Sequence, residues 1–195
     1  GKAMKKFNKF ETAQIKTGSV FDPLPKGAYV LKILRAEECT TKKGDGEYIK
    51  VAFDIAEGEY KDFYKKQFDA ITDEDKHWPY DGIYNLAAPD DDSPQWMIDG
   101  FGTFIAALED SNSGYHWDWD ETKLKGKKVG CIFRNEEWEY NDKSGFTARP
   151  FKFIAVEKIK TGNYRLPKDK LLNNSTATAD TSSATSYQDI PDDDL

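Results

Sequence analysis

The segment from Tyr48 to Ile55 alternates strictly between apolar side chains and the residues between them. Its apolar positions are Ile49, Val51, Phe53 and Ile55. Successive side chains of a β-strand point to opposite faces, so this alternation predicts a strand that is buried on one face. Such a strand needs partners in a sheet and a layer that covers its apolar face.

The neighbouring segments supply the partners. Residues 28–35 are rich in β-branched, aromatic and long apolar side chains, and a Lys-Lys-Gly-Asp-Gly turn at 42–46 joins them to the alternating strand. Residues 63–68 predict a third strand, although their Lys and Gln are also compatible with a helical turn. Residues 129–134 and 151–156, with a turn at 141–145, predict a second hairpin whose arms project beyond the core.

One helix is expected between the two groups of strands. Residues 71–96 contain three prolines and an Asp90–Asp92 run, which predicts a long connection with at most short helical turns. Apolar residues then recur at three- and four-residue spacing from Met97 to Leu108, which predicts an amphipathic helix that ends near residues 111–114. Three strands, a helix and two strands is the order of a five-stranded OB-like barrel with its helix between strands 3 and 4. Many β-meanders with a helix share this order.

Length and composition divide the chain into three parts. The 195 residues suffice for one domain, which we place at 21–160, after an N-terminal arm at 1–20 whose residues 1–3 are interpreted as a tag scar. Residues 161–195 are predicted to be a flexible linker and an acidic tail, because 173–186 contain only Asn, Ser, Thr, Ala and Asp. The fold class is therefore mainly β, an OB-like barrel with a disordered acidic C-terminal tail.

The sequence offers little for catalysis or metal binding. Its two cysteines, Cys39 and Cys131, lie in apolar stretches and form no CxxC motif, so we expect buried free thiols in a reducing, cytoplasmic compartment. Its two histidines, His77 and His116, are interpreted as ordinary surface or packing residues. Walker A, GxGxxG and calcium-loop patterns are not found. We expect no enzymatic activity, no metal, no cofactor and no membrane span.

The net charge of −7 comes mostly from the C-terminal residues of the chain. Residues 180–195 hold five aspartates and no Lys or Arg, so the remainder carries a net charge of about −2. A nearly neutral body can carry a local basic patch, whereas a uniformly acidic one would repel nucleic acid. The composition therefore permits DNA binding without demonstrating it.

Aromatic residues interleave with Lys and Arg on segments that would line the groove of an OB barrel. In a protein that binds single strands, rings stack on bases and cations follow the phosphates, without readout of sequence. The candidate DNA-binding residues are Tyr48, Lys50, Lys65, Lys66, Arg134, Trp138, Tyr140 and Arg149.

Two alternatives compete with this interpretation. The same rings could form a satellite core beneath solvated lysines, and Glu136, Glu137 and Glu139 beside Trp138 would repel phosphates. Carbohydrate binding through tryptophans is the second alternative. Asp118 and Asp120 alternate with Trp117 and Trp119 and could lie across a sugar. The tryptophans of this alternative are Trp78, Trp96, Trp117 and Trp119.

The last nine residues form an acidic peptide with apolar anchors. An Ile-Pro pair and a terminal Leu among aspartates would suit a basic-rimmed pocket on a partner protein, whereas acids alone would only aid solubility. The candidate partner-binding residues are Asp189, Ile190, Pro191, Asp192, Asp193, Asp194 and Leu195.

Several motifs resemble those of phage-encoded single-stranded DNA-binding proteins from replication modules. The acidic tail is similar to the bacterial form, which closes on Ile-Pro-Phe, although here Asp189-Ile190-Pro191 is followed by Asp192-Asp193-Asp194-Leu195. The body, over roughly residues 20–170, shares a Gly27-x-Tyr29 strand, a helix ending in Ser111-Asn112, a Gly126–Gly130 strand start and an Asn163–Pro167 exit.

The resemblance implies an OB barrel that binds single-stranded DNA without strong sequence preference during bacteriophage DNA replication or recombination. It further implies that the tail docks replication or recombination proteins in the host cytoplasm. The alternative is a protein-interaction or regulatory adaptor of a phage replication module that does not bind DNA. The two-sided apolar first strand could serve a homodimer as easily as a barrel interior.

Overall fold

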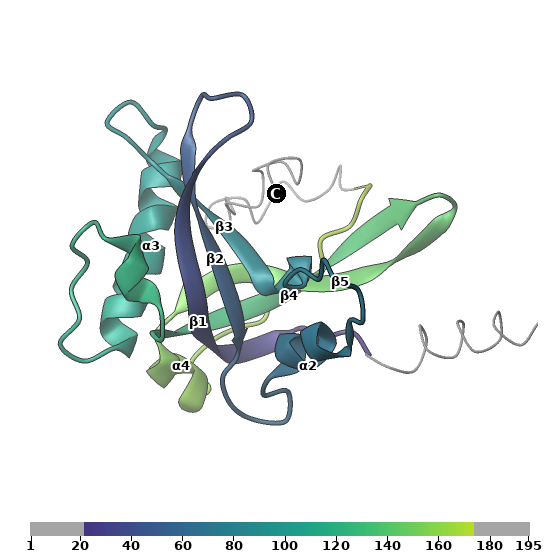
Figure 1. Cartoon of the computed structure of the whole chain (residues 1–195). Helices are drawn as coiled ribbons and strands as arrows, with labels where there is room; N and C mark the ends of the chain where they lie inside the picture. The colour runs from purple at the N-terminus through teal and green to yellow at the C-terminus, as the bar shows by residue number, and fades with distance from the viewer. Residues whose placement is uncertain (1–21, 174–195) are drawn as a thin grey trace, which may run out of the picture.

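The computed structural model of the chain describes residues 22–173. The expected N-terminal arm and the acidic partner-binding peptide 187–195 lie outside the described residues. The fold of the described residues is mainly β (Figure 1). Its strands are β1 Gly27–Thr40, β2 Glu47–Ile55, β3 Ile83–Ala88, β4 Lys128–Tyr140 and β5 Lys143–Ile154. Its helices are α2 Phe63–Ala70, α3 Gln95–Ser111 and α4 Val156–Lys160, with short 3₁₀ turns η1 Tyr80–Gly82 and η2 Glu121–Leu124.

The five strands form one antiparallel sheet in the order β3-β2-β1-β4-β5. The long strand β1 is central because its first half pairs with β4 and its second half with β2, where a bulge shifts the register between Ile33 and Arg35. No backbone pairing joins β3 to β5 in residues 22–173, so the sheet is open there. The number of strands and the helix between the third and fourth are as predicted, but the third strand is a different segment and the sheet is not a closed barrel.

The apolar face of the alternating segment is buried as predicted. Ile49, Val51, Phe53 and Ile55 of β2 are each at most 4% exposed and belong to the core. Helix α3 contributes Phe104 and Leu108 to the same core and contacts β3, β4 and β5. The predicted helix and both strands of the first hairpin are therefore confirmed.

Two predictions of secondary structure are wrong. Residues 63–70 form helix α2 instead of the third strand, because the buried carboxylate of Asp54 accepts hydrogen bonds from the backbone N–H groups of Tyr64 and Lys65 at 2.9 and 3.0 Å. The free N–H groups of a helix start need such acceptors. The third strand is β3, inside the expected long connection, where Ile49 of β2 pairs with Leu86.

The second hairpin is longer than predicted. Asn141 and Asp142 have φ of 47° and 62° and form a two-residue turn, so residues 143–145 belong to β5 instead of a five-residue turn. Val156, predicted as the last residue of a strand over 151–156, is instead the first residue of helix α4. The hairpin projects from the body of the molecule (Figure 1).

Part of the segment assigned to the flexible linker is ordered against this hairpin. The Lys170 N–H donates to the Asn135 carbonyl and the Glu137 N–H donates to the Lys170 carbonyl, both at 2.8 Å. Lys26, just before β1, also pairs with Asp169 at 2.9 Å. Lys170 therefore pairs with β4 at Glu136, just past Phe133, which lies opposite Gly27, the first residue of β1.

Candidate nucleic-acid interface

The β4–β5 hairpin brings four of the eight candidate DNA-binding residues onto one surface. Arg134 lies directly opposite Arg149 in the register, and Tyr140 lies opposite Lys143. Alternate residues of a strand share a face, as do directly opposed residues of an antiparallel pair. We call this surface the hairpin face, and it comprises Arg134, Trp138, Tyr140, Lys143 and Arg149.

The aromatic residues of the hairpin face are accessible. Trp138 is 41% exposed and Tyr140 is 72% exposed. A Cβ atom added at Gly145, opposite Trp138, would lie 3.0 Å from the indole, so the indole rests on the bare backbone of Gly145. The hairpin thus presents one supported ring and one free ring at sites where bases could stack.

The two arginines are held in place by acids. The Arg134 Nη2 lies 3.2 Å from a Glu136 carboxylate oxygen, and its guanidinium lies 4.4 Å from the centre of the Phe151 ring. Arg149 is more exposed, at 40% of its side chain, and lies 3.8 Å from an Asp81 carboxylate oxygen. Arg134 and Arg149 are directly opposed like charges and repel each other. Glu136 and Asp81 reduce this repulsion, and a bound phosphate could do the same.

The hairpin glutamates do not all face the arginines. Glu137 and Glu139 pair with Phe146 and Ser144, which places them on the opposite face from Trp138. A Glu137 carboxylate oxygen also accepts a hydrogen bond from the Leu172 N–H at 3.4 Å. Only Glu136, already paired with Arg134, shares the hairpin face, so the repulsion expected from three glutamates is reduced.

The remaining four candidates lie elsewhere. Tyr48, expected on the open face of β2, is only 3% exposed, so its ring is not accessible for stacking. Lys50 is half-buried, with Glu37 of β1 and Asn85 of β3 as its register neighbours. Lys65 and Lys66 are exposed on α2, where a 2.6 Å hydrogen bond to Asp69 raises the pKa of Lys65.

The structure adds residues that the sequence did not single out. Tyr80 is 66% exposed in η1, next to Asp81, the acid that pairs with Arg149. The strand register places Lys143 opposite Tyr140, and Phe151 lies at the bulge, where its ring contacts the Arg134 guanidinium. No local sequence motif predicts either position. The Asn85 amide oxygen on β3 is buried without a hydrogen-bond partner.

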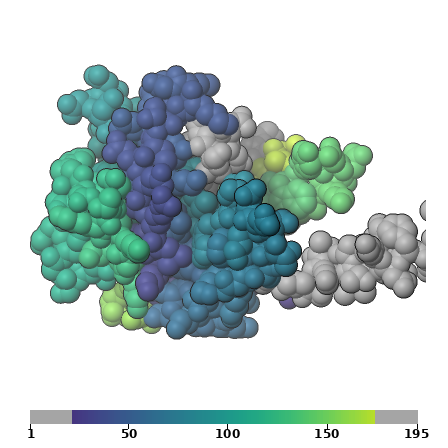
Figure 2. Space-filling view, in the orientation of Figure 1, coloured from purple at the N-terminus to yellow at the C-terminus, as the bar shows by residue number. Residues whose placement is uncertain are grey.

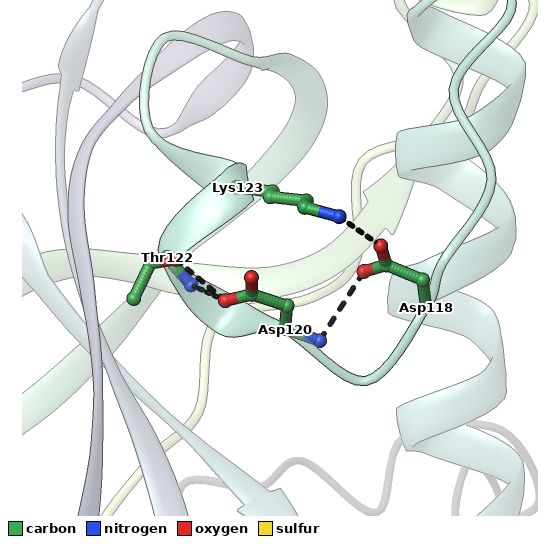
Figure 3. Close-up of polar contacts among 4 residues, drawn as sticks. All are labelled: Asp118, Asp120, Thr122 and Lys123. Atoms are coloured by element: carbon green, nitrogen blue, oxygen red, sulfur yellow. Dashed lines mark hydrogen bonds and ion pairs between the residues drawn. The ribbon is translucent and has the colours of Figure 1, made fainter.

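The two aspartates that alternate with tryptophans form hydrogen bonds within the loop after α3 (Figure 3). Asp118 pairs with Lys123 and accepts the Asp120 N–H at 3.3 Å, and Asp120 accepts the Thr122 N–H at 3.1 Å, which caps η2. The hydrogen bond to Lys123 lowers the pKa of Asp118. These carboxylates are engaged in folding their own loop.

Neither a metal centre nor a membrane-spanning helix is found within residues 22–173. No group of three or more His, Cys, Asp or Glu side chains there is arranged to hold a metal ion. No helix in this range combines the length and the apolar character that crossing a bilayer requires. Cys131 is buried and Cys39 half-buried, both as free thiols, and both histidines are exposed as expected.

Part of the chain matches the model of a protein family. Residues 8–81, less than half of the chain, match a family described as "Protein of unknown function (DUF669)". Within the described residues this segment includes β1, β2 and α2 but not the hairpin face. None of the curated proteins compared with the chain matches it.

Proposed function

We propose that the chain is a non-enzymatic, phage-encoded single-stranded DNA-binding protein that acts without strong sequence preference in DNA replication or recombination. The observation that carries the proposal is the hairpin face, where the exposed rings of Trp138 and Tyr140 share one face of the hairpin with the opposed Arg134 and Arg149. Rings can stack on bases of any sequence, and arginines neutralise phosphates.

The sheet order supports the same proposal. The order β3-β2-β1-β4-β5, with α3 between β3 and β4, is compatible with an OB fold left open between its edge strands. OB folds bind oligonucleotides between the strand 2–3 face and the loops at the ends of strands 1 and 4. The projecting β4–β5 hairpin corresponds to the second of these loops.

The tail completes the proposal. Residues Asp189 to Leu195 would recruit replication or recombination proteins through Ile190, Pro191 and Leu195, with the aspartates meeting a basic rim. The alternative, an adaptor that binds protein through the hairpin, is an outcome of the test below.

Fluorescence anisotropy of a labelled thymidine oligomer of about 16 nucleotides, the upper site size of one OB fold, tests the proposal. The full chain should bind it at low salt, and Trp138→Ala with Tyr140→Ala should weaken binding by about tenfold or more, because each stack contributes about 1–3 kcal/mol. Trp96→Ala is the matched control, because Trp96 is 40% exposed on α3 and Trp138 is 41% exposed. No binding by the wild-type chain would favour the adaptor, and unchanged affinity in a folded double variant would remove the hairpin as the site.

A further inference from the structure

A second basic surface lies away from the hairpin face, beside helix α2. A groove of about 600 Å³ is bounded by α2, β1 and the start of β4, and we call it the α2 groove. Helix α2 packs against β2 and lies on the near side of the molecule in Figures 1 and 2. The lysines that line the groove come from four separate segments and are Lys32, Lys61, Lys65 and Lys128.

Two of these lysines are placed where like charges repel. Lys32 of β1 and Lys128 of β4 are direct partners in the antiparallel register. Both are exposed, and no ion pair joins either of them to a carboxylate within residues 22–173. Opposed like charges destabilise a sheet, and an anion between them would remove the cost. The backbone of Lys128 is fixed by Asn112, whose side chain bonds its N–H at 3.0 Å and its carbonyl at 2.7 Å.

The carboxylates of the groove are largely committed to other groups. Asp54 accepts three backbone N–H groups, from Ile55, Tyr64 and Lys65, at 2.9, 2.9 and 3.0 Å. Asp69 pairs with Lys65. The four lysines that line the groove outnumber its three aspartates by one, so the groove carries a net positive charge that favours an anion.

The groove also has an aromatic wall. The rings of Phe68 and Trp78 lie 5.6 Å apart, and the Trp78 indole N–H donates to the carbonyls of Phe53 and Gly82, both at 3.2 Å. These bonds satisfy the polar edge of the indole and fix its orientation. The groove therefore offers apolar ring surface next to a net positive charge.

We propose that the α2 groove binds a nucleotide, with its phosphate between Lys32 and Lys128 and its base against Phe68 and Trp78. The volume lies within the range of about 300–1,000 Å³ typical of small-molecule sites. The nucleotide could come from solution or from a DNA strand. The inference stands on residues outside the hairpin face and does not depend on it.

Isothermal titration calorimetry of the full chain with thymidine 5′-monophosphate tests this inference. Binding should be observed, thymidine without the phosphate should bind far more weakly, and Lys32→Gln with Lys128→Gln should weaken binding about tenfold or more, because two charge-assisted contacts are lost. Lys158→Gln with Lys160→Gln removes the same charge from α4, where both lysines are exposed, and should leave affinity within about twofold. Loss of the Lys32–Lys128 repulsion should leave the double variant at least as stable to urea as the wild type.

The same variants distinguish the two sources of the nucleotide. If the groove holds one unit of a strand, the Lys32/Lys128 variant also loses affinity for the thymidine oligomer. If it holds a free nucleotide, only binding of the monophosphate falls. The Trp138/Tyr140 variant should retain monophosphate binding in either case, so failure of the hairpin proposal is visible separately. No heat of binding with the wild-type chain, or equal affinity in the Lys32/Lys128 variant, would overturn the inference.

Discussion

The rings of Tyr84 on β3 and Phe153 on β5 pack edge to face, with their centres 4.8 Å apart, between strands that share no backbone hydrogen bonds in the described residues. Phe153 also meets Phe104 of α3 at 4.7 Å. The two edges of the open sheet are therefore held together by side-chain packing and by α3. Removing one of these rings should loosen the whole domain.

Phe153→Ala should lower the free energy of unfolding by about 3–5 kcal/mol, because it leaves a cavity between Tyr84 and Phe104, which both pack on the Phe153 ring. Urea unfolding followed by circular dichroism measures this change. Phe146→Ala is the control on the same strand, because Phe146 is 45% exposed and its loss should cost about 0.5 kcal/mol or less. An equal fall in the free energy of unfolding in the two variants would show that the packing of Phe153 on Tyr84 and Phe104 contributes no special stability.

Asp54 is a buried acceptor that supports the start of α2. Asp54→Ala should lower the free energy of unfolding by about 1–3 kcal/mol, because three backbone N–H groups lose their acceptor. Asp69→Asn, an exposed change on the same helix, should cost about 0.5 kcal/mol or less. Hydrogen exchange should show faster exchange at Tyr64 and Lys65 in the Asp54 variant. Unchanged protection there would contradict the capping role.

Tyr29 should make stability depend on alkaline pH. Burial, followed by nearby Tyr60 and Glu59, raises the pKa of Tyr29 from 10.0 to about 12. Between these values the folded chain keeps a proton that the unfolded chain loses, so the unfolding free energy falls as pH rises across this interval. Tyr29→Phe should have a shallower decline, measured by urea unfolding at several pH values. Parallel profiles for the two proteins would disprove the contribution.

Arg149 should contribute to the salt dependence of DNA binding. Arg149→Gln removes the more exposed arginine of the hairpin face and should reduce the slope of log affinity against log salt by about 0.7, the value for one single-strand phosphate contact. Anisotropy titrations of the thymidine oligomer across a salt series measure the slope. Arg35→Gln is the control, because Arg35 lies on β1 and pairs with Glu37. An equal change in both variants would indicate a general charge effect.

The hairpin face was predictable only in part. Arg134, Trp138 and Tyr140 are separated by even numbers of residues on β4, so the alternation of side chains in a strand places them on one face. The pairing of Arg149 with Arg134 depends on the two-residue turn at Asn141 and Asp142 and on the bulge near Phe133, which local patterns did not specify. Tyr48 fits the same alternation as Lys50, yet it is buried, because alternation assigns a side of the strand and does not say what covers that side.

The sequence by itself determined β2 and α3, because their apolar residues recur with the period of a strand and of a helix, respectively. It also determined β1, whose β-branched, aromatic and long apolar residues favour a strand. It left short segments undecided. Residues 63–70 became a helix because Asp54, on the preceding strand, accepts hydrogen bonds from their first N–H groups, and residues 83–88 became a strand because β2 offered a free edge. Tertiary structure alone set Lys32 opposite Lys128 and Tyr84 against Phe153, since register and long-range packing depend on the whole sheet.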